Sequence, residues 1–165
     1  MKKTMLFVLI LCLCFTAVGA AFGETVATET PAEEMTAEEL YQAGKAAENA
    51  GDYEKAMEYY QLAADAGDAE GWRSIGTMYA NGEGVEPDYD RALEYYQLAA
   101  DQGDMKAFYN IGKFYQYGLA VEQDIGKAIE WFEKSGELGY SDACVLLGSL
   151  YQYGEGVEQD IKKAA

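Results

Sequence analysis

The sequence predicts an all-α fold, a right-handed α-solenoid of antiparallel helix pairs. A block of the chain repeats every 36 residues, and fixed periods of this size are typical of solenoids. The composition agrees, because only two prolines occur and alanine, leucine, glutamate, glutamine and methionine favour helix. The period is plainest at one aspartate position and one glycine position, which hold Asp52, Asp88, Asp124 and Asp160, and Gly76, Gly112 and Gly148.

The first helix of a repeat is predicted from residues 68–81. Trp72, Ile75 and Tyr79 fall at i, i+3 and i+7, which places them on one face of a helix. Asp68 precedes them and can accept hydrogen bonds from free backbone N–H groups at the helix start. Gly82 follows and tolerates the left-handed conformation that ends a helix.

The second helix begins after Pro87, which bars helix. Ala92, Tyr96 and Ala99 form its apolar face. Aromatic residues recur at two neighbouring positions of this helix, and repetition at core spacing favours packing over a ligand cage. They are Tyr59, Tyr60, Tyr95, Tyr96, Trp131 and Phe132.

A glycine recurs in the middle of the first helix, where it costs about 1 kcal/mol relative to alanine. Its recurrence predicts close approach of the second helix, with a small alanine as the expected neighbour. Gly112→Leu is therefore expected to destabilise the fold through a clash.

The chain before the repeats divides into three parts. Residues 1–23 have the layout of a secretory signal peptide, with cleavage expected after Ala20 or Gly23; an uncleaved anchor is the alternative. Residues 24–35 resemble an acidic, flexible linker. A capping box of Thr36 and Glu39 predicts the first helix of a pair over 36–67.

Composition excludes several kinds of chemistry. The chain has no histidine, which removes histidine bases, Ser-His pairs and imidazole zinc sites. The net charge of −17 repels nucleic acid and anionic membrane and suits a basic partner, or simply solubility. Cys144 is the one cysteine outside the predicted signal segment, and we expect it to be a small buried hydrophobe.

The repeat resembles two known patterns. Trp72-x2-Ile75-Gly76-x2-Tyr79, followed by Ala92-x3-Tyr96, looks like the tetratricopeptide pattern. The loop Tyr79-x2-Gly82-x-Gly84-Val85-x2-Asp88 is similar to that of the Sel-one-like repeat, a relative with a longer loop. The resemblance covers the units 68–103, 104–139 and an incomplete 140–165, whereas 36–67 resembles a plain tetratricopeptide unit with a shorter loop.

The resemblance implies an adaptor that binds a protein or peptide along the first helices of its repeats. Arg73, Lys106 and Lys113 would form a positive stripe able to receive a peptide carboxylate, although an ordinary solvated face is the alternative. The complete set of expected partner-binding residues is Glu70, Arg73, Thr77, Lys106, Tyr109, Lys113, Gln116, Ser149 and Gln152.

These observations predict an exported, periplasmic or secreted, non-enzymatic interaction scaffold without metal, cofactor or catalytic residues. Two alternatives remain, an envelope hydrolase or β-lactam-binding protein by family analogy and a secreted effector acting on a host. The last repeat stops about one turn into its second helix, which indicates either a fragment or an open end suited to docking and self-association.

Overall fold

The computed structural model describes residues 32–154 and Asp160. The predicted signal peptide, most of the predicted linker and the second helix of the last repeat lie outside these residues. The self-association expected at the open end depends on that last segment and also falls outside them.

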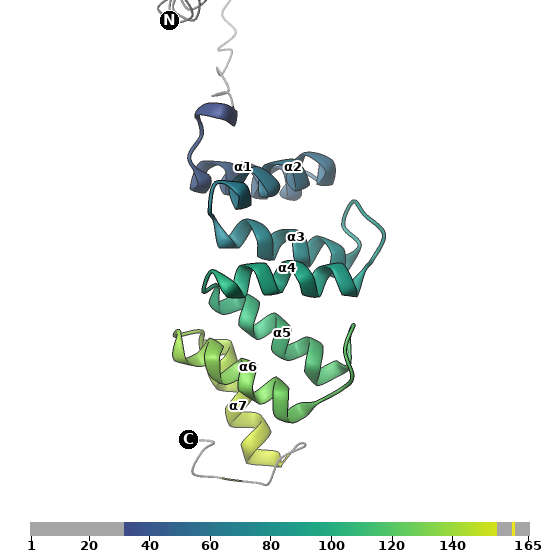
Figure 1. Ribbon diagram of the computed structural model, residues 1–165, viewed down its shortest axis with the longest axis vertical. Helices are drawn as coiled ribbons and strands as arrows, with labels where there is room; N and C mark the ends of the chain where they lie inside the picture. Colours follow the sequence, from purple (N-terminus) through teal and green to yellow (C-terminus); the bar gives the residue numbers. More distant parts are fainter. Residues whose placement is uncertain (1–31, 155–159, 161–165) are drawn as a thin grey trace, which may run out of the picture. The chain divides into compact units, whose positions relative to one another are not determined.

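Residues 32–154 form a short 3-10 turn and seven α-helices, and no strand occurs in this range. The helices pack in sequence order as pairs, so the predicted α-solenoid of helix pairs is confirmed. Figure 1 shows the long loops that follow α3 and α5 on the same side of the helices. The elements are η1 (Ala32–Glu34), α1 (Ala37–Asn49), α2 (Tyr53–Asp65), α3 (Ala69–Asn81), α4 (Tyr89–Asp101), α5 (Met105–Tyr117), α6 (Ile125–Glu137) and α7 (Ser141–Tyr153).

The end of the predicted linker has structure of its own. Ala32–Glu34 forms the 3-10 turn, and Ala32 and Met35 pack against the first hydrophobic cluster. Burial of these two apolar side chains fixes the chain just before the first helix.

Side chains cap the helices where the sequence predicts. Thr36 Oγ1 accepts from the Glu39 N–H, and the Glu39 carboxylate accepts from the Thr36 N–H, which completes the capping box. Helix α7 differs, because Tyr140 precedes it and makes no side-chain cap. The capping aspartates of α2 to α6 are Asp52, Asp68, Asp88, Asp104 and Asp124.

The core is built from alanines and aromatic rings in three successive clusters. Tyr60, Tyr96 and Phe132 are almost fully buried, as expected for residues that pack between repeats. Ser135 replaces an alanine and is also fully buried. Its hydroxyl donates to the Met105 carbonyl over 2.6 Å, which satisfies the polar group inside the core.

The mid-helix glycines do approach the second helix, and the expected alanine is a neighbour at Gly76, where a Cβ would lie 3.1 Å from the Ala92 carbonyl oxygen; the nearest atoms, however, belong to an aromatic ring. A Cβ on Gly112 would lie 2.5 Å from the ring of Phe132, and one on Gly44 would lie 2.6 Å from the ring of Tyr60. Large rings occupy this space because the missing side chain leaves room for their faces. The glycine therefore faces an aromatic ring first, and the alanine backbone comes second.

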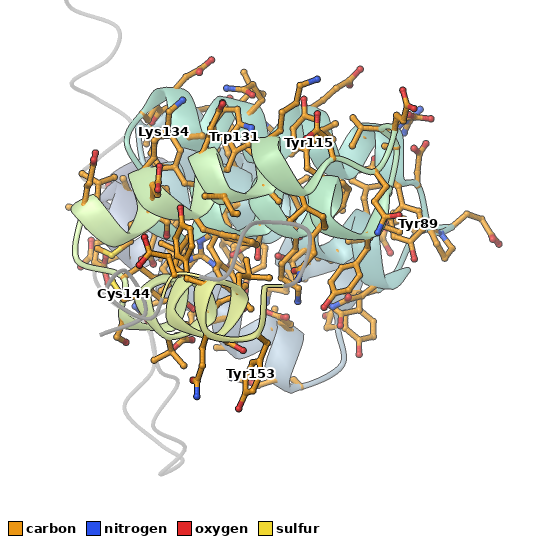
Figure 2. All side chains as sticks on the ribbon, turned by 90° about the horizontal axis from the view of Figure 1, so that it is seen from below. Tyr89, Tyr115, Trp131, Lys134, Cys144 and Tyr153 are labelled. Carbon is orange, nitrogen blue, oxygen red and sulfur yellow. The ribbon has the colours of Figure 1, made fainter. Side chains whose placement is uncertain are left out.

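The expected burial of Cys144 was also wrong, because its thiol is free and exposed. Trp72 and Phe108 hold the same position in earlier repeats, where they stack on Tyr95 and Trp131 of the helix that follows. The helix that would follow α7 lies outside the described residues. Figure 2 shows Cys144 on α7, at a distance from Trp131.

Candidate functional site

A pocket of about 310 Å³ lies between α3, α4 and α5, where two successive repeats meet. Aromatic and aliphatic side chains line it together with four polar ones, Thr77, Asn81, Asn110 and Lys113. Its nine lining residues are Thr77, Ala80, Asn81, Tyr89, Tyr96, Asn110, Lys113, Phe114 and Leu119.

The repeat geometry brings these residues together. Thr77 and Lys113 occupy equivalent positions of α3 and α5, so the period itself places them in neighbouring repeats. Tyr89 is the first residue of α4 and packs edge-on against Phe114, with ring centroids 5.8 Å apart. Tyr96 meets Phe114 in the same way at 5.4 Å. The two tyrosines thus hold Phe114 in the pocket wall.

Lys113 is the one basic residue among the lining residues, and no acidic residue is among them. Within the described part of the chain, no carboxylate lies within 4.0 Å of its ammonium group. The Lys113 Nζ instead lies 5.8 Å from the centre of the Tyr109 ring. Lys113 is thus the one charged residue that lines the pocket, and the Glu83 carboxylate lies beside the pocket, where its Oε1 accepts from the Asn81 side chain over 3.1 Å.

The hydroxyls of Thr77 and Tyr96 lie 3.2 Å apart, and Thr77 also donates to the Arg73 carbonyl over 3.0 Å. Burial raises the pKa of Tyr96 above its usual value, while the hydrogen bond with Thr77 acts in the opposite direction. Tyr96 therefore remains a neutral phenol at physiological pH.

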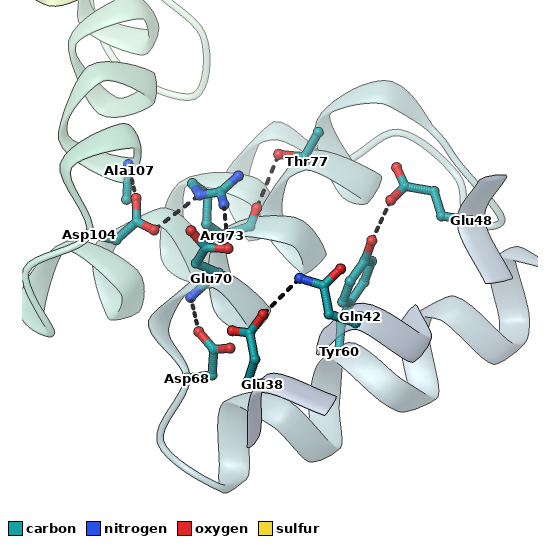
Figure 3. Close-up of polar contacts among 10 residues, drawn as sticks. All are labelled: Glu38, Gln42, Glu48, Tyr60, Asp68, Glu70, Arg73, Thr77, Asp104 and Ala107. Atoms are coloured by element: carbon teal, nitrogen blue, oxygen red, sulfur yellow. Dashed lines mark hydrogen bonds and ion pairs between the residues drawn. The ribbon is translucent and has the colours of Figure 1, made fainter. Parts of the chain in front are cut away.

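Arg73 lies outside the pocket and joins two repeats. Its Nε donates to Asp104 Oδ2 over 3.1 Å, and Glu70 lies 3.7 Å from its Nη2 (Figure 3). Burial lowers the pKa of Arg73, but the charge of Asp104 and their hydrogen bond outweigh it, so the pKa is raised. Arg73 thus has an internal carboxylate partner, unlike Lys113.

The other expected partner-binding residues are spread over the molecule. Glu70 and Lys106 line a second cavity of about 320 Å³ beside the α4–α5 turn. Tyr109 packs between Phe132 and Tyr140, with ring centroids 5.5 and 5.2 Å away. Gln116 on α5 and Ser149 and Gln152 on α7 are not among the residues that line the pocket with Lys113.

Of the expected partner-binding residues, only Thr77 and Lys113 line this pocket. Tyr89 and Phe114 were missed because each occupies a position that reads as core packing. Asn110 lies next to the expected residue Tyr109, and only the rotation of α5 decides which of the two faces the pocket. The neighbouring repeats have Ser74 and Leu146 at that position, so the residue type there gave no recurring signal.

Residues 32–154 and 160 contain no group of three or more cysteine, aspartate or glutamate side chains placed to hold a metal ion. Over the same residues, no helix combines the length and apolar character required to cross a membrane.

The fold is that of an α-solenoid repeat protein with a pocket at the junction of two repeats. The chain belongs to the Sel1 repeat family, whose model matches four stretches, at residues 31–68, 74–104, 106–140 and 141–165. The first stretch contains the pair that resembled a plain tetratricopeptide unit. A comparison with curated proteins finds no match.

Solved structures of Sel1 repeat proteins are similar to this one. A Sel1 repeat protein from Oxalobacter formigenes is 35% identical with a TM-score of 0.74, and the match covers 81% of this chain and 56% of that protein. A protective antigen of uropathogenic Escherichia coli strains, with an SLR fold, is 29% identical with a TM-score of 0.68, over 78% of this chain and 30% of the antigen.

A third neighbour bears on the fold alone. Cysteine rich protein B of Helicobacter pylori is 24% identical with a TM-score of 0.55, over 72% of this chain and 98% of that protein. This chain thus spans about half of the Oxalobacter protein and under a third of the Escherichia coli antigen.

Proposed function

We propose that this protein is a non-enzymatic interaction scaffold that binds a polypeptide partner in the pocket between α3, α4 and α5. Proteins built from Sel1 repeats generally mediate protein–protein interactions. The observation that carries the proposal is the position of Lys113, which has no carboxylate partner in the described chain and lies in a pocket shared by two repeats. Solenoids stack their repeats into extended surfaces that bind partners.

The lack of an acid–base pair supports a binding role over a catalytic one. General acid–base catalysis needs groups whose pKa values are suited to proton transfer, most often histidine or carboxylates. The sequence contains no histidine, and the pocket is lined by neither aspartate nor glutamate. We therefore expect β-lactam turnover by the purified protein to remain at the background rate.

A partner with basic segments fits the outer surface of the second helices. Exposed carboxylates recur there at two positions of each repeat, and their combined field favours cations. Figure 2 shows Lys134 beside Trp131 on this surface, with its Nζ 4.2 Å from the ring centre. The recurring carboxylates are Glu58, Glu94 and Glu130, and Asp65, Asp101 and Glu137.

Export also belongs to this proposal. Its support is the sequence of residues 1–23, in which Lys2 and Lys3 precede an apolar stretch and small residues. Cell fractionation with N-terminal sequencing tests it. Recovery of the exported chain starting at Ala21 or Glu24 is expected, and an intact N-terminus in the cytoplasm would contradict it.

Photo-cross-linking in cells tests the binding site. A benzophenone amino acid placed at Ala80, in the pocket, should give a discrete adduct with the partner, because Ala80 lies within reach of a bound chain. The same group at Asn49, which is exposed at the end of α1, is the control. Adducts from Asn49 without any from Ala80 would place binding elsewhere and overturn the proposal.

A further inference from the structure

We infer that the outer face of α2 and α4, termed the outer track, binds a basic amphipathic helix of the partner, whose apolar stripe lies on Leu62 and Leu98. This inference rests on the proposed function and specifies the structure and chemistry of the partner's basic segment. The outer track consists of six exposed residues, Glu58, Leu62, Asp65, Glu94, Leu98 and Asp101.

The sequence of the outer track recurs without change in two repeats. Residues 58–65 and 94–101 both read EYYQLAAD. Core packing accounts for the buried part of each segment, which in α2 consists of Tyr60, Ala63 and Ala64. Exposed positions tolerate substitution with little change in stability, so packing does not require their repetition. The repeated exposed residues therefore point to one contact that is made twice.

Within each helix, a leucine lies between two carboxylates. Glu58 precedes Leu62 by four residues and Asp65 follows it by three, and these spacings place the three side chains on one face of α2. Leu62 is 37% exposed, and Leu98 at the same position of α4 is 44% exposed. The two helices together thus present an apolar row with an acidic row on either side.

The carboxylates of the outer track have no lysine or arginine partner among the described residues. Gln61 Nε2 donates to Asp65 Oδ1 over 3.0 Å, and Gln97 Nε2 donates to Asp101 Oδ1 over 2.8 Å. Each amide orients a carboxylate and leaves its second oxygen to accept from a partner. Neither EYYQLAAD segment contains a basic residue, so the field over the outer track attracts cations.

The spacing of the helices suits a helical partner. Helix α3 packs against both α2 and α4. Packed helices have axes about 8–10 Å apart, so the axes of α2 and α4 lie at most about 20 Å apart. A helix of about 13 residues spans this distance. An extended segment would turn every second side chain away from the surface, whereas a helix can keep an apolar stripe and its flanking lysines or arginines on one side.

The apolar row ends at the next repeat. Lys134 of α6 occupies the position of Leu62, and its Nζ lies 4.2 Å from the centre of the Trp131 ring (Figure 2). Glu130 and Glu137 continue the acidic rows there, but the lysine repels a basic partner and offers no exposed leucine. The outer track therefore spans two repeats, the distance that a helix of about 13 residues covers.

Binding of designed peptides tests the inference. The probe is a fluorescein-labelled, amidated peptide of about 18 residues, long enough to span the outer track, in which leucines form one helical face and lysines fill the rest. A shuffled peptide of the same composition, whose leucines share no face, is the control. In fluorescence anisotropy at physiological salt, we expect the amphipathic peptide to bind the full chain at least about tenfold more tightly than the shuffled one.

Substitution of the leucines assigns the binding to the outer track. Leu62→Ser combined with Leu98→Ser should weaken binding of the amphipathic peptide at least about tenfold, because its apolar stripe loses both contacts. Leu138→Ser is the control, since Leu138 is 49% exposed and lies outside the outer track, and it should leave the affinity unchanged. Circular dichroism on each variant confirms that the helices remain formed.

Substitution of carboxylates separates local contacts from net charge. Glu58→Gln combined with Glu94→Gln should weaken binding at least about threefold, because two charged contacts to lysine are lost. Glu86→Gln combined with Glu122→Gln changes the net charge equally at two exposed loop positions. This control pair should change the affinity less than about 1.5-fold, since distant exposed charges are screened by salt.

Equal affinity for the amphipathic and shuffled peptides would overturn the inference, because net charge alone would then explain the attraction. An unchanged affinity in the leucine double variant, equal losses from the two glutamine pairs, or no binding of either peptide would overturn it as well. Cross-linked adducts from Ala80 that persist alongside any of these results would preserve the scaffold function and reject only the outer track.

Discussion

Arg73 Nε donates to Asp104 Oδ2 over 3.1 Å and so ties α3 to the residue that caps α5 in the next repeat (Figure 3). The two side chains are only 13% and 6% exposed. The other oxygen of Asp104 accepts from the Ala107 N–H over 2.7 Å. One carboxylate thus caps a helix and fixes the spacing of two repeats.

Replacing Asp104 with asparagine should lower the free energy of unfolding by about 2 kcal/mol, because one of its two charged hydrogen bonds is lost next to a buried guanidinium group. Urea unfolding followed by circular dichroism measures the change.

Asp68 is the matched control, since it occupies the equivalent cap of α3 and accepts from Glu70 N over 2.8 Å. Burial raises the pKa of Asp68, so its charged form is not favoured by the fold. Asp68→Asn should therefore cost less than about 0.5 kcal/mol. Equal losses in the two variants would contradict the role assigned to the ion pair.

Gly112 is expected to tolerate no side chain. A Cβ there would lie 2.5 Å from Phe132, so Gly112→Ala should destabilise the fold by about 2 kcal/mol, and Gly112→Leu by more, although alanine favours helix by about 1 kcal/mol. Thermal unfolding measures both.

The double variant Gly112→Ala with Phe132→Leu identifies the cause. Loss of the ring edge should relieve the clash, so the combined cost should fall below the sum of the single costs by at least about 0.5 kcal/mol. Strict additivity would show that the ring is not the obstacle.

Alanine substitutions at Gly84 and Gly103 distinguish the cost of a steric clash from the cost of backbone strain. Both have positive φ, 73° and 85°, but a Cβ on Gly84 would lie 2.4 Å from Tyr53 Cβ, whereas nothing lies within 4 Å of one on Gly103. Gly103→Ala should cost about 1 kcal/mol from left-handed strain alone. Gly84→Ala should cost about 1–3 kcal/mol more through overpacking, measured by urea unfolding. Equal costs would argue against close packing of the α3–α4 loop on α2.

High pH should destabilise the protein through its tyrosines. Burial, followed by the hydrogen bond to Asp142, raises the pKa of Tyr140 from 10.0 to about 12. Between these values the unfolded chain has lost a proton that folded Tyr140 keeps, so stability falls as the pH rises from about 10 to about 12. Other tyrosines with a raised pKa act in the same direction: Tyr41, Tyr60, Tyr95, Tyr96 and Tyr109.

The urea midpoint at pH 9 and pH 11 measures this loss. Tyr140→Phe removes one titrating group, so the variant should lose less stability over the interval than the parent protein. The same loss in both would show that Tyr140 does not contribute.

Much of the fold was predictable from local chemistry. Asp88 and Gly82 mark a helix start and a helix end through hydrogen bonding and left-handed backbone, which depend on a few neighbouring residues. The glycine at 112 signalled close approach because glycine recurs at this position of successive repeats, although it is unfavourable within a helix. Which side chain fills the space could not be predicted, because it depends on how two helices rotate against each other.

The candidate site was predictable only in part. The period placed Thr77 and Lys113 at one position of successive repeats, and the structure brings both to the pocket. The sequence period gave no means to distinguish the unpaired Lys113 from the paired Arg73. The carboxylate that pairs with Arg73 belongs to Asp104 in the next repeat. Tyr89 and Phe114 were hidden, since core packing and pocket lining require the same residue types.

The most direct test of the scaffold proposal uses the three asparagines of the chain, Asn49, Asn81 and Asn110. Two of them line the pocket, and Asn49 lies outside it as an internal reference. The measurement is an NMR titration of asparagine-selectively ¹⁵N-labelled protein with the partner captured through Ala80. We predict that the side-chain signals of Asn81 and Asn110 shift together at saturation while those of Asn49 remain in place. Shifts confined to Asn49, or none at saturation, would contradict binding in this pocket.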